Sequence, residues 1–417
     1  MSVRKLHDAP WLTSGPSGQV LALLNGNGEE ARAVGGAVRN ALMKLDVGEI
    51  DIATTALPDE VIRRAKAAHI KSVPTGIEHG TVTLVVDGAP FEVTTLREDV
   101  ETFGRKAKVA FGRDWKRDAE RRDFTMNGLS ASIDGVVHDH VGGIADLDAR
   151  RVRFIGDPDR RIAEDYLRIL RFFRIHAAYG AGAPDREGTL ASIRGRDGIA
   201  GLSAERVRME MMKLLVADGA FAAVDSMVDA GLMLRIAGGV TYKGPFAAMI
   251  VIEQVLGQKP DAVLRLGALG VAVTEDARRL AQKLRLSNDE TKALDSMGHR
   301  WWRLKGMDES HARRRLYRLG EVRYRNRMML AWARAGRDAD SEAWKALVTL
   351  PERWTPPVFP LKAADFMARG IAKGPALGHV LALAEDAWLA LDFPMEVDVM
   401  TVIADQTIAR FKHDHQL

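Results

Sequence analysis

The sequence predicts an α+β head, built on a small mixed sheet of roughly five strands with helices, followed by an all-α remainder. Strand-like runs are confined to about the first 140 residues. From about Arg160 onward apolar residues recur with a period near 3.6, typical of helices, and segments rich in Gly or Pro separate the helical stretches. At 417 residues the chain exceeds one ordinary core. We therefore expect domains at residues 1–140, 141–235, 236–340 and 341–417.

The composition is that of a globular chain that does not contact a membrane. Hydrophobic residues make up 47% and charged residues 28% of the chain, and no run reaches the roughly 18 apolar residues that a membrane helix needs. The absence of cysteine excludes a disulfide framework, a thiolate zinc site and a cysteine nucleophile. We expect a cytoplasmic protein. A net charge of +4 and a pI near 9.2 permit a phosphate-binding surface without requiring one.

A glycine pair in the head lies between a short apolar run and a segment of good helix formers. Gly35 and Gly36 allow a sharp turn and close approach of the backbone to a ligand. The following helix would offer free N–H groups to a phosphate, and Arg39 would add a charged donor. A plain strand-to-helix turn is the alternative interpretation.

Carboxylates and isoleucines alternate in the run Glu49-Ile50-Asp51-Ile52. On a strand, this alternation places Glu49 and Asp51 on one face, about 6.5 Å apart, and the isoleucines in the core. Two such carboxylates repel each other unless a cation lies between them, and hard oxygen ligands suit Mg²⁺. The alternative is a solvated strand face.

A hairpin is predicted further along, where Thr81 to Val86 and Phe91 to Leu96 flank an Asp-Gly turn. Glu92 is a candidate third metal ligand if its strand lies beside the first, or else an exposed strand residue. Asp123, in the run Arg121-Arg122-Asp123, is the rival third ligand or a partner for its own arginines.

Several motifs follow one another in a specific order between residues 30 and 215. They are Gly35 to Arg39, Glu49 to Thr54, Arg121 to Asn127, Gly142 to Leu147, Ala163 to Arg171 and Leu202 to Arg206. In this order and spacing they resemble the signature of class II nucleotidyltransferases, which include CCA-adding enzymes and bacterial poly(A) polymerases. The chain departs from the family pattern at two positions, with Glu49 and Asn40 where Asp is usual.

The resemblance implies a Mg²⁺-dependent enzyme that adds nucleotides to the 3′ end of an RNA. It implies catalytic roles for Glu49, Asp51 and Glu92, with the first two also as metal ligands. The implied nucleotide-binding residues are Gly36, Arg39, Arg122, Asp123, Asn127, Asp165, Arg168, Arg171 and Arg174. It also implies that the three helical divisions are a neck that selects the nucleobase, a body, and a tail that contacts tRNA.

A polar stripe is predicted on one helix, because Asp165, Arg168, Arg171 and Arg174 recur every third residue. Cytosine and adenine both present an amino donor beside a ring-nitrogen acceptor, whereas uracil and guanine present the reverse. A carboxylate beside a guanidinium, such as Asp165 and Arg168, therefore pairs only with C or A, and a mismatch costs about 1 to 3 kcal/mol per unsatisfied group. By resemblance this is the base-reading motif; the alternative is an ordinary solvated face.

Features outside the shared motifs favour CCA addition over poly(A) synthesis. Pro74 to Thr83 resembles the corresponding stretch of CCA-adding enzymes, and Arg97 to Phe111 resembles the flexible loop of members that add the final A. The expected partners are then ATP, CTP and the tRNA 3′ end. A poly(A) polymerase and a non-catalytic RNA-binding relative remain alternatives, and the sequence does not predict the oligomeric state.

Arginines and aromatic residues are interleaved between His299 and Arg337. They fit either contact with tRNA or a helix core, and the core is the favoured interpretation for Trp332.

Overall fold

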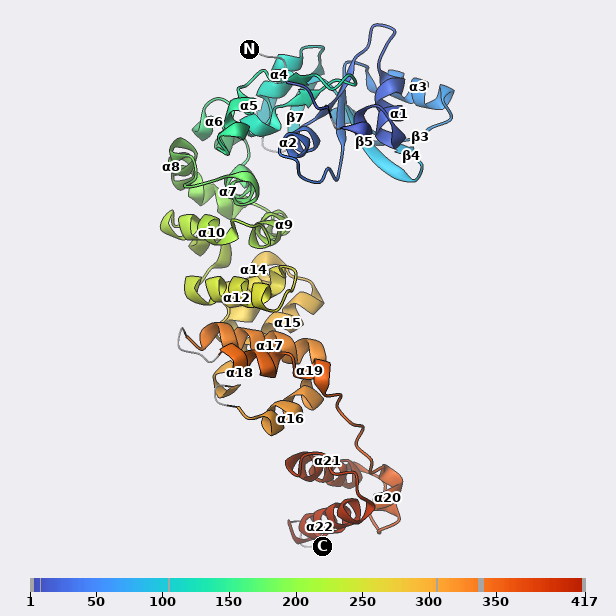
Figure 1. Ribbon diagram of the computed structural model, residues 1–417, viewed down its shortest axis with the longest axis vertical. Helices are drawn as coiled ribbons and strands as arrows, with labels where there is room; N and C mark the ends of the chain where they lie inside the picture. Colours follow the sequence, from blue (N-terminus) through green and yellow to red (C-terminus); the bar gives the residue numbers. More distant parts are fainter. Residues whose placement is uncertain (1–3, 8, 104–105, 305–306, 337–340, 415–417) are drawn as a thin grey trace. The chain divides into compact units, whose positions relative to one another are not determined.

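The chain folds into two compact units, one formed by Met1–Thr241 with Gln282–Arg285 and the other by Tyr242–Ala281 with Leu286–Leu417. The computed structural model describes residues 4–7, 9–103, 106–304, 307–336 and 341–414, and for 98–103 and 106–109 the backbone alone. The α+β head and the all-α remainder are confirmed (Figure 1). The expected domain boundaries at 140, 235 and 340 stay predictions.

The first unit begins with a mixed sheet of seven strands, larger than the sheet of roughly five that we expected. The order is β3-β4-β5-β2-β1-β8-β9. The strands are β1 (Ala31–Val34), β2 (Asp51–Thr54), β3 (Lys71–Gly76), β4 (Thr81–Val86), β5 (Ala89–Thr95), β8 (Ser130–Ala131) and β9 (Val137–His138). Only β2 and β5 run parallel, and both carry predicted site residues at adjacent register positions, with Ile52 beside Val93.

The predicted hairpin forms between β4 and β5. Asp87 and Gly88 both have positive φ, of 50° and 79°, which is the conformation of a two-residue turn that matches the twist of the strands. The second strand starts at Ala89, two residues earlier than expected. Along it Phe91, Val93 and Thr95 are buried and Glu92 is exposed, so Glu92 lies on the face of the strand opposite these buried residues.

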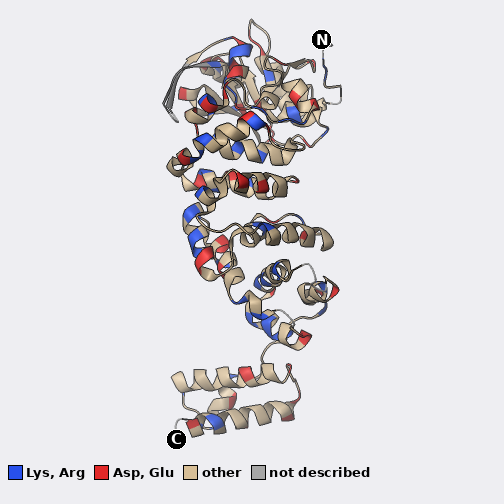
Figure 2. Ribbon diagram, turned by 90° about the vertical axis from the view of Figure 1, so that its left-hand side faces the viewer, with Lys and Arg blue, Asp and Glu red and all other residues tan. Residues whose placement is uncertain are grey.

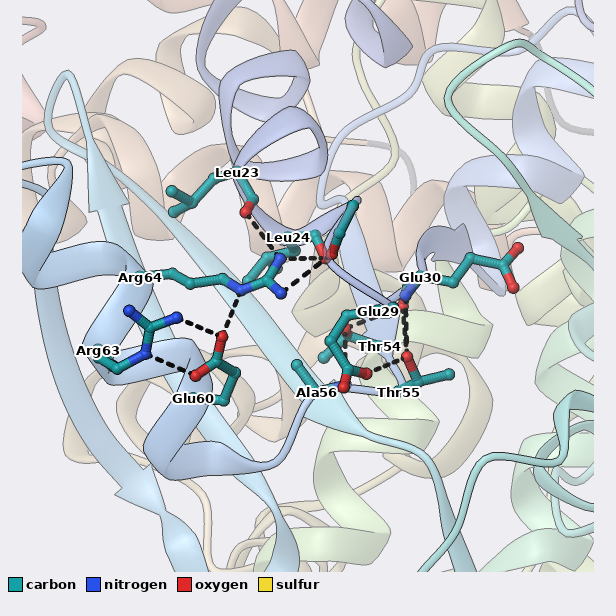
Figure 3. Close-up of polar contacts among 12 residues, drawn as sticks. Leu23, Leu24, Glu29, Glu30, Thr54, Thr55, Ala56, Glu60, Arg63 and Arg64 are labelled. Carbon is teal, nitrogen blue, oxygen red and sulfur yellow. Dashed lines mark hydrogen bonds and ion pairs between the residues drawn. The ribbon is translucent and has the colours of Figure 1, made fainter.

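Helices α1 (Gly15–Leu24) and α3 (Pro58–Ala67) pack against the sheet and are joined by a buried arginine (Figure 3). Arg64 on α3 donates to the carbonyl oxygens of Leu24 at 3.1 Å and Gly26 at 3.0 Å, which satisfies acceptors at the end of α1. Glu60 accepts from Arg64 at 2.7 Å. Hydrogen bonds from Arg63 and Arg64 lower the pKa of Glu60 to about 2.

The end of β2 is fixed to the segment before β1 by two threonines (Figure 3). Thr54 donates its hydroxyl to the Glu30 carbonyl at 2.9 Å, and Thr55 donates to the Glu29 carboxylate at 2.5 Å. Because β2 begins at Asp51, these bonds hold the strand that presents the candidate metal ligand.

The segment Arg97 to Phe111, expected as a flexible loop, forms a two-stranded ribbon of β6 (Arg97–Phe103) and β7 (Lys106–Phe111). Residues 104–105 lie outside the described residues. The pairing of Arg97 with Phe111 brings the two ends of the segment together.

The rest of the first unit is helical. It contains α2 (Gly36–Leu42), α4 (Trp115–Glu120), α5 (Gly143–Asp148), α6 (Pro158–Glu164), α7 (Leu167–Tyr179), α8 (Arg186–Gly195), α9 (Ala204–Leu215), α10 (Ala220–Asp229) and α11 (Leu232–Ala237). Helix α7 packs against α9 and α10 and buries eight of its thirteen residues, among them Phe172 and Phe173. The helix expected to read the base is therefore also part of the core.

The second unit is built from helices alone in the part of the chain that is described. These are α12 (Lys243–Val255), α13 (Ala262–Gly270), most of α14 (Thr274–Leu284), α15 (Asn288–Gly298), α16 (Glu309–Leu319), α17 (Glu321–Arg334), α18 (Ser341–Val348), α19 (Leu350–Arg353), α20 (Ala363–Met367), α21 (Pro375–Ala390) and α22 (Val397–Asp414). Trp332 is 7% exposed, as its predicted core role requires. Among the described residues, none of the helices in either unit is both long and apolar enough to cross a membrane.

Candidate active site

The glycine pair forms the turn between β1 and α2, as predicted. Gly35 has a φ of +70°, a conformation that side-chain-bearing residues rarely adopt, and its N–H donates to the Leu129 carbonyl at 3.0 Å. A Cβ atom on Gly35 would lie 3.4 Å from an Nη atom of Arg122, and one on Gly36 would lie 3.5 Å from Arg39 Nη2. Two guanidinium groups thus lie against this turn.

The acidic run begins earlier than the strand that was expected to carry it. Strand β2 starts at Asp51, so the prediction that Glu49 lies on the strand is wrong. Val34 pairs with Asp51, and the chain turns away at Gly35, so β1 offers no partner to residues before Asp51. Ile50 is accordingly only partly buried, whereas Ile52 is 1% exposed as predicted.

Asp51 lies in a field of negative charge. The side chain of Asp51 remains accessible to water, but partial loss of hydration raises its pKa. The negative charges of Glu92 and Glu49 raise this pKa further, whereas the positive charge of Arg122 lowers it. The register of β2 and β5 places Asp51 beside Glu92. A divalent cation would relieve this repulsion, so Asp51 with its acidic neighbours fits such an ion chemically. Within the described ranges, however, no group of three or more His, Asp or Glu residues is already gathered closely enough to hold a metal.

Asp123, the rival third ligand, is 9% exposed and forms an ion pair with Arg171 at 2.6 Å. Burial alone raises the pKa of Asp123, but the charge and hydrogen bonds of Arg171, with bonds from Asn127 and the Phe124 amide, outweigh it and lower the pKa. Its partner is thus an arginine of α7 and neither of the two arginines that precede it in the sequence.

Those two arginines pair with Asp118, a residue that the sequence analysis missed. Arg121 lies 2.7 Å and Arg122 3.1 Å from its carboxylate. Burial raises the pKa of Asp118, but the two guanidinium groups outweigh burial and lower it. The i, i+3 and i, i+4 spacing is the signal that would have found the pair. The interaction holds Arg122 against the glycine turn.

A chain of hydrogen bonds links the turn to α7. Arg39, 6% exposed, donates to Asn127 Oδ1 at 2.6 Å, and Asn127 donates to Asp123 Oδ1 at 3.2 Å. Asp123 then accepts from Arg171. The structure therefore brings together four predicted nucleotide-binding residues of the head and neck.

The predicted stripe on α7 is correct for its arginines and wrong for its aspartate. Arg168, Arg171 and Arg174 are all partly buried on the helix. Asp165 has extended backbone angles, with φ −156° and ψ 106°, and lies in the break before α7. Its carboxylate accepts from the N–H of Leu167, the first residue of α7, at 3.1 Å, and its extended backbone separates α6 from α7.

The stripe residues have partners that the sequence did not indicate. Arg206 binds Asp165 at 2.6 Å, and Glu164 binds Arg168 at 2.5 Å. Glu210 on α9 is 3% exposed and pairs with both Arg171 and Arg174. Arg206 and Glu210 are separated from their partners by about 40 positions in the sequence, so no local sequence pattern predicts these pairs.

Comparison with known proteins adds to this geometry. The model of the poly A polymerase head domain family matches residues 31–153, and that of the probable RNA and SrmB-binding site of polymerase A matches residues 189–239. The structure is similar to the crystal structure of the Bacillus stearothermophilus CCA-adding enzyme in complex with CTP. The TM-score is 0.74 and the identity 25%, over 95% of this chain and 98% of that one.

Two curated relatives match over most of their length. The chain is 33% identical to CCA tRNA nucleotidyltransferase 1, mitochondrial, of Mus musculus, over 88% of this chain and 85% of the relative. It is 30% identical to the CCA-adding enzyme of Limosilactobacillus fermentum, over 88% of this chain and 90% of the relative. With the glycine turn, the acidic residues of β2 and β5 and the arginines of α7 in one unit, the chain belongs to the CCA tRNA nucleotidyltransferase family.

Proposed function

We propose that this protein adds C, C and A to the 3′ end of tRNA, using CTP and ATP and a bound Mg²⁺ ion. The observation that carries the proposal is the position of Asp51, which lies beside Glu92 within reach of the charge of Arg122. Relatives named as CCA-adding enzymes, one of them solved with CTP, support it.

In this proposal the head holds the metal and the triphosphate. Asp51 and Glu49 are metal ligands, and Glu92 or Asp123 is the third, with Glu92 favoured because Asp123 is already paired with Arg171. A divalent ion held by these residues would lower the pKa of the attacking 3′-hydroxyl and neutralise phosphate charge. Arg39 and Arg122, which lie against Gly35 and Gly36, donate hydrogen bonds to the phosphates.

The base is selected at the start of α7. Asp165 and Arg168 are each held by another residue, Arg206 and Glu164, and each keeps hydrogen-bonding capacity toward a base. Arg171 and Arg174 support them from the next turns of the helix. A fixed hydrogen-bond acceptor beside a fixed donor can pair with the Watson–Crick edges of C and A. Opposite U or G, the same acceptor and donor would stay buried without hydrogen-bond partners.

The body carries arginines suited to the phosphates of tRNA. Among the described residues, four of them form neither a salt bridge nor a side-chain hydrogen bond, namely Arg300, Arg303, Arg315 and Arg323. Burial lowers the pKa of Arg315, and the charges of Arg303, Arg318 and Arg300 lower it further. Such mutual repulsion is relieved by a polyanion, and RNA is the polyanion on which this family acts.

The test is incubation with Mg²⁺, tRNA lacking its last three nucleotides, and each labelled nucleotide in turn. We expect CTP to be incorporated first, ATP to follow, and synthesis to stop after three nucleotides. Extended ATP incorporation without CTP would identify a poly(A) polymerase. Binding of tRNA without release of pyrophosphate would identify a non-catalytic relative. Either result would overturn the proposal.

For cellular location we propose the cytoplasm. The proposal rests on the cysteine-free composition, and mitochondrial relatives such as the mouse protein make fractionation of the producing cell its test. Recovery in an organelle would contradict it.

A further inference from the structure

The buried guanidinium of Arg39 is held by neutral groups. Asn40 Oδ1 accepts from Nε at 3.1 Å and from Nη2 at 2.9 Å, and Asn127 Oδ1 accepts from Nη1 at 2.6 Å. The Tyr179 ring covers its face, with the central carbon 3.6 Å from the ring centroid. Within the part of the chain that the structure describes, Arg39 forms no ion pair.

This arrangement leaves two donors and one positive charge available. A guanidinium has five N–H groups, and the three bonds to Asn40 and Asn127 leave one on each Nη atom. Nη2 is the atom nearest to the Cβ position of Gly36, so one free donor lies at the glycine turn. Burial of a cation is costly, and Asp123, whose charge opposes the effect of burial on the pKa of Arg39, is already paired with Arg171, so this site remains receptive to an anion.

Tyr179 reaches Arg39 from a distant part of the chain. It is the last residue of α7, whereas Arg39 lies on α2, and 140 residues separate them. The same helix carries Arg168 and Arg171 near its start. One helix thus contacts the candidate base-reading site at one end and the candidate triphosphate site at the other.

We propose that Tyr179 is a positioning residue, whose ring fixes the plane of Arg39 so that its free N–H groups face the triphosphate of CTP or ATP. The inference rests on the proposed function, because it takes the glycine turn as the triphosphate site. The ring stabilises the guanidinium face by cation–π contact, and it touches no part of the nucleotide in this scheme.

The test compares Tyr179→Leu, which removes the aromatic face, with Tyr179→Phe, which keeps it. Dissociation constants for CTP and for pyrophosphate are measured by calorimetry with Mg²⁺ on the full chain. We expect the dissociation constants of the leucine variant for CTP and pyrophosphate to rise about five- to thirty-fold. Those of the phenylalanine variant should stay within about two-fold of the wild type. The preference for CTP over UTP should be unchanged in both variants. Tyr242→Leu is the matched control, since Tyr242 stacks under Arg334 in the other unit.

The outcomes separate this inference from the proposed function. If the wild type binds and incorporates CTP while Tyr179→Leu binds it equally well, the positioning role is wrong and the function stands. If Tyr179→Phe is as weak as Tyr179→Leu, the aromatic face is not what matters, and the role is wrong again. A fall in melting temperature with unchanged binding assigns Tyr179 to stability and also overturns the inference. If the wild type binds no CTP at all, both proposals fall.

Discussion

In the proposed function, the chemistry of the head depends on Asp51. It is the first residue of β2, and Glu92, Glu49 and Arg122 all act on its pKa. Repulsion between this carboxylate and the neighbouring acidic side chains destabilises the folded protein. Binding of a cation would relieve that repulsion.

Asp51→Asn is expected to reduce nucleotide transfer by more than about a hundredfold, since it removes one metal ligand. It should also raise the melting temperature of the metal-free protein at pH 7. A raised pKa means that the folded state favours the protonated form, so the charged carboxylate opposes folding above that pKa. The gain should therefore shrink as pH falls through the raised pKa and the wild type becomes protonated.

Transfer assays and melting curves between pH 7 and pH 4 measure both effects. Asp87→Asn is the control, because Asn fits the positive φ of that turn and Asp87 is not among the groups that shift the pKa of Asp51. Wild-type transfer by Asp51→Asn would reject the metal role.

Arg168→Ala is expected to relax the choice of base. Removing the donor opposite the base should lower the preference for CTP over UTP by about five- to a hundredfold, corresponding to roughly 1 to 3 kcal/mol. The ratio of kcat/KM values for the two nucleotides measures this. Arg194→Ala, which removes an exposed arginine paired with Asp159, should leave the ratio unchanged. An unaltered ratio in Arg168→Ala would remove Arg168 from base reading.

At the scale of elements, the contact between α3 and α1 is expected to contribute stability that depends on pH. Glu60 accepts from Arg63 and Arg64, and Arg64 in turn binds carbonyls at the end of α1. The carboxylate therefore orients a buried guanidinium that joins two helices on the same sheet.

Glu60→Gln should destabilise the protein at pH 7 and progressively less in acid. The pKa of Glu60 is lowered from 4.5 to about 2, so its stabilising contribution is complete above pH 4.5 and is lost as pH falls toward 2. Urea unfolding of the variant and the wild type at pH 7, 5 and 3.5 should show two curves that converge in acid. Glu120→Gln, whose wild-type carboxylate lies 3.8 Å from Lys116, is the control and should show little change. A gap that stays constant with pH would contradict the role of Glu60.

Local signals predicted the elements well and their ends less well. The Asp87-Gly88 turn and the glycine turn at Gly35 each depend on backbone conformations that a few adjacent residues determine, and both were predicted. The start of β2 depends instead on where β1 turns away, so Glu49 was placed wrongly on the strand. The estimate of roughly five strands falls short of the seven observed, and strands as short as β8 and β9, with two residues each, carry almost no sequence pattern.

Asp118 was missed although its spacing from Arg121 and Arg122 is a local signal, whereas other missed site residues arise from contacts between distant parts of the chain. Glu210 meets Arg174 across 36 positions, and Tyr179 meets Arg39 across 140. Neither shows a periodicity or motif of its own. Asp165 was included in the stripe because its spacing is helical, but its extended backbone places it outside the helix.

At the scale of the whole molecule, charge is distributed unevenly among the helices of the second unit. Helix α21 carries only two charged residues, Glu385 and Asp386, and is drawn almost entirely tan (Figure 2). In the described part of the chain, arginines that form no ion pair with a carboxylate occur instead around η5 (Trp301–Leu304), α16 and α17, where burial and the charges of Arg315 and Arg323 lower the pKa of Arg327.

Replacing Arg315 and Arg323 together with alanine should weaken tRNA binding and reduce its salt dependence. Each lost phosphate contact is expected to lower the slope of log affinity against log salt by about 1. Filter binding at several salt concentrations measures the slope. Arg63→Ala, which removes an exposed arginine of α3 paired with Glu60, is the control. An unchanged slope in the double variant would exclude these two arginines from the RNA-binding surface.

The burial of α7 limits how the enzyme can change during evolution or engineering. Eight of its thirteen residues are buried, and Arg171 and Arg174 share one nearly inaccessible carboxylate, Glu210. Substitutions on α7 that change the nucleotide specificity must therefore also fit the hydrophobic core of the first unit. Libraries randomised on this helix should lose folded protein faster than they gain new specificities, so compensating changes on α9 are the place to begin a redesign.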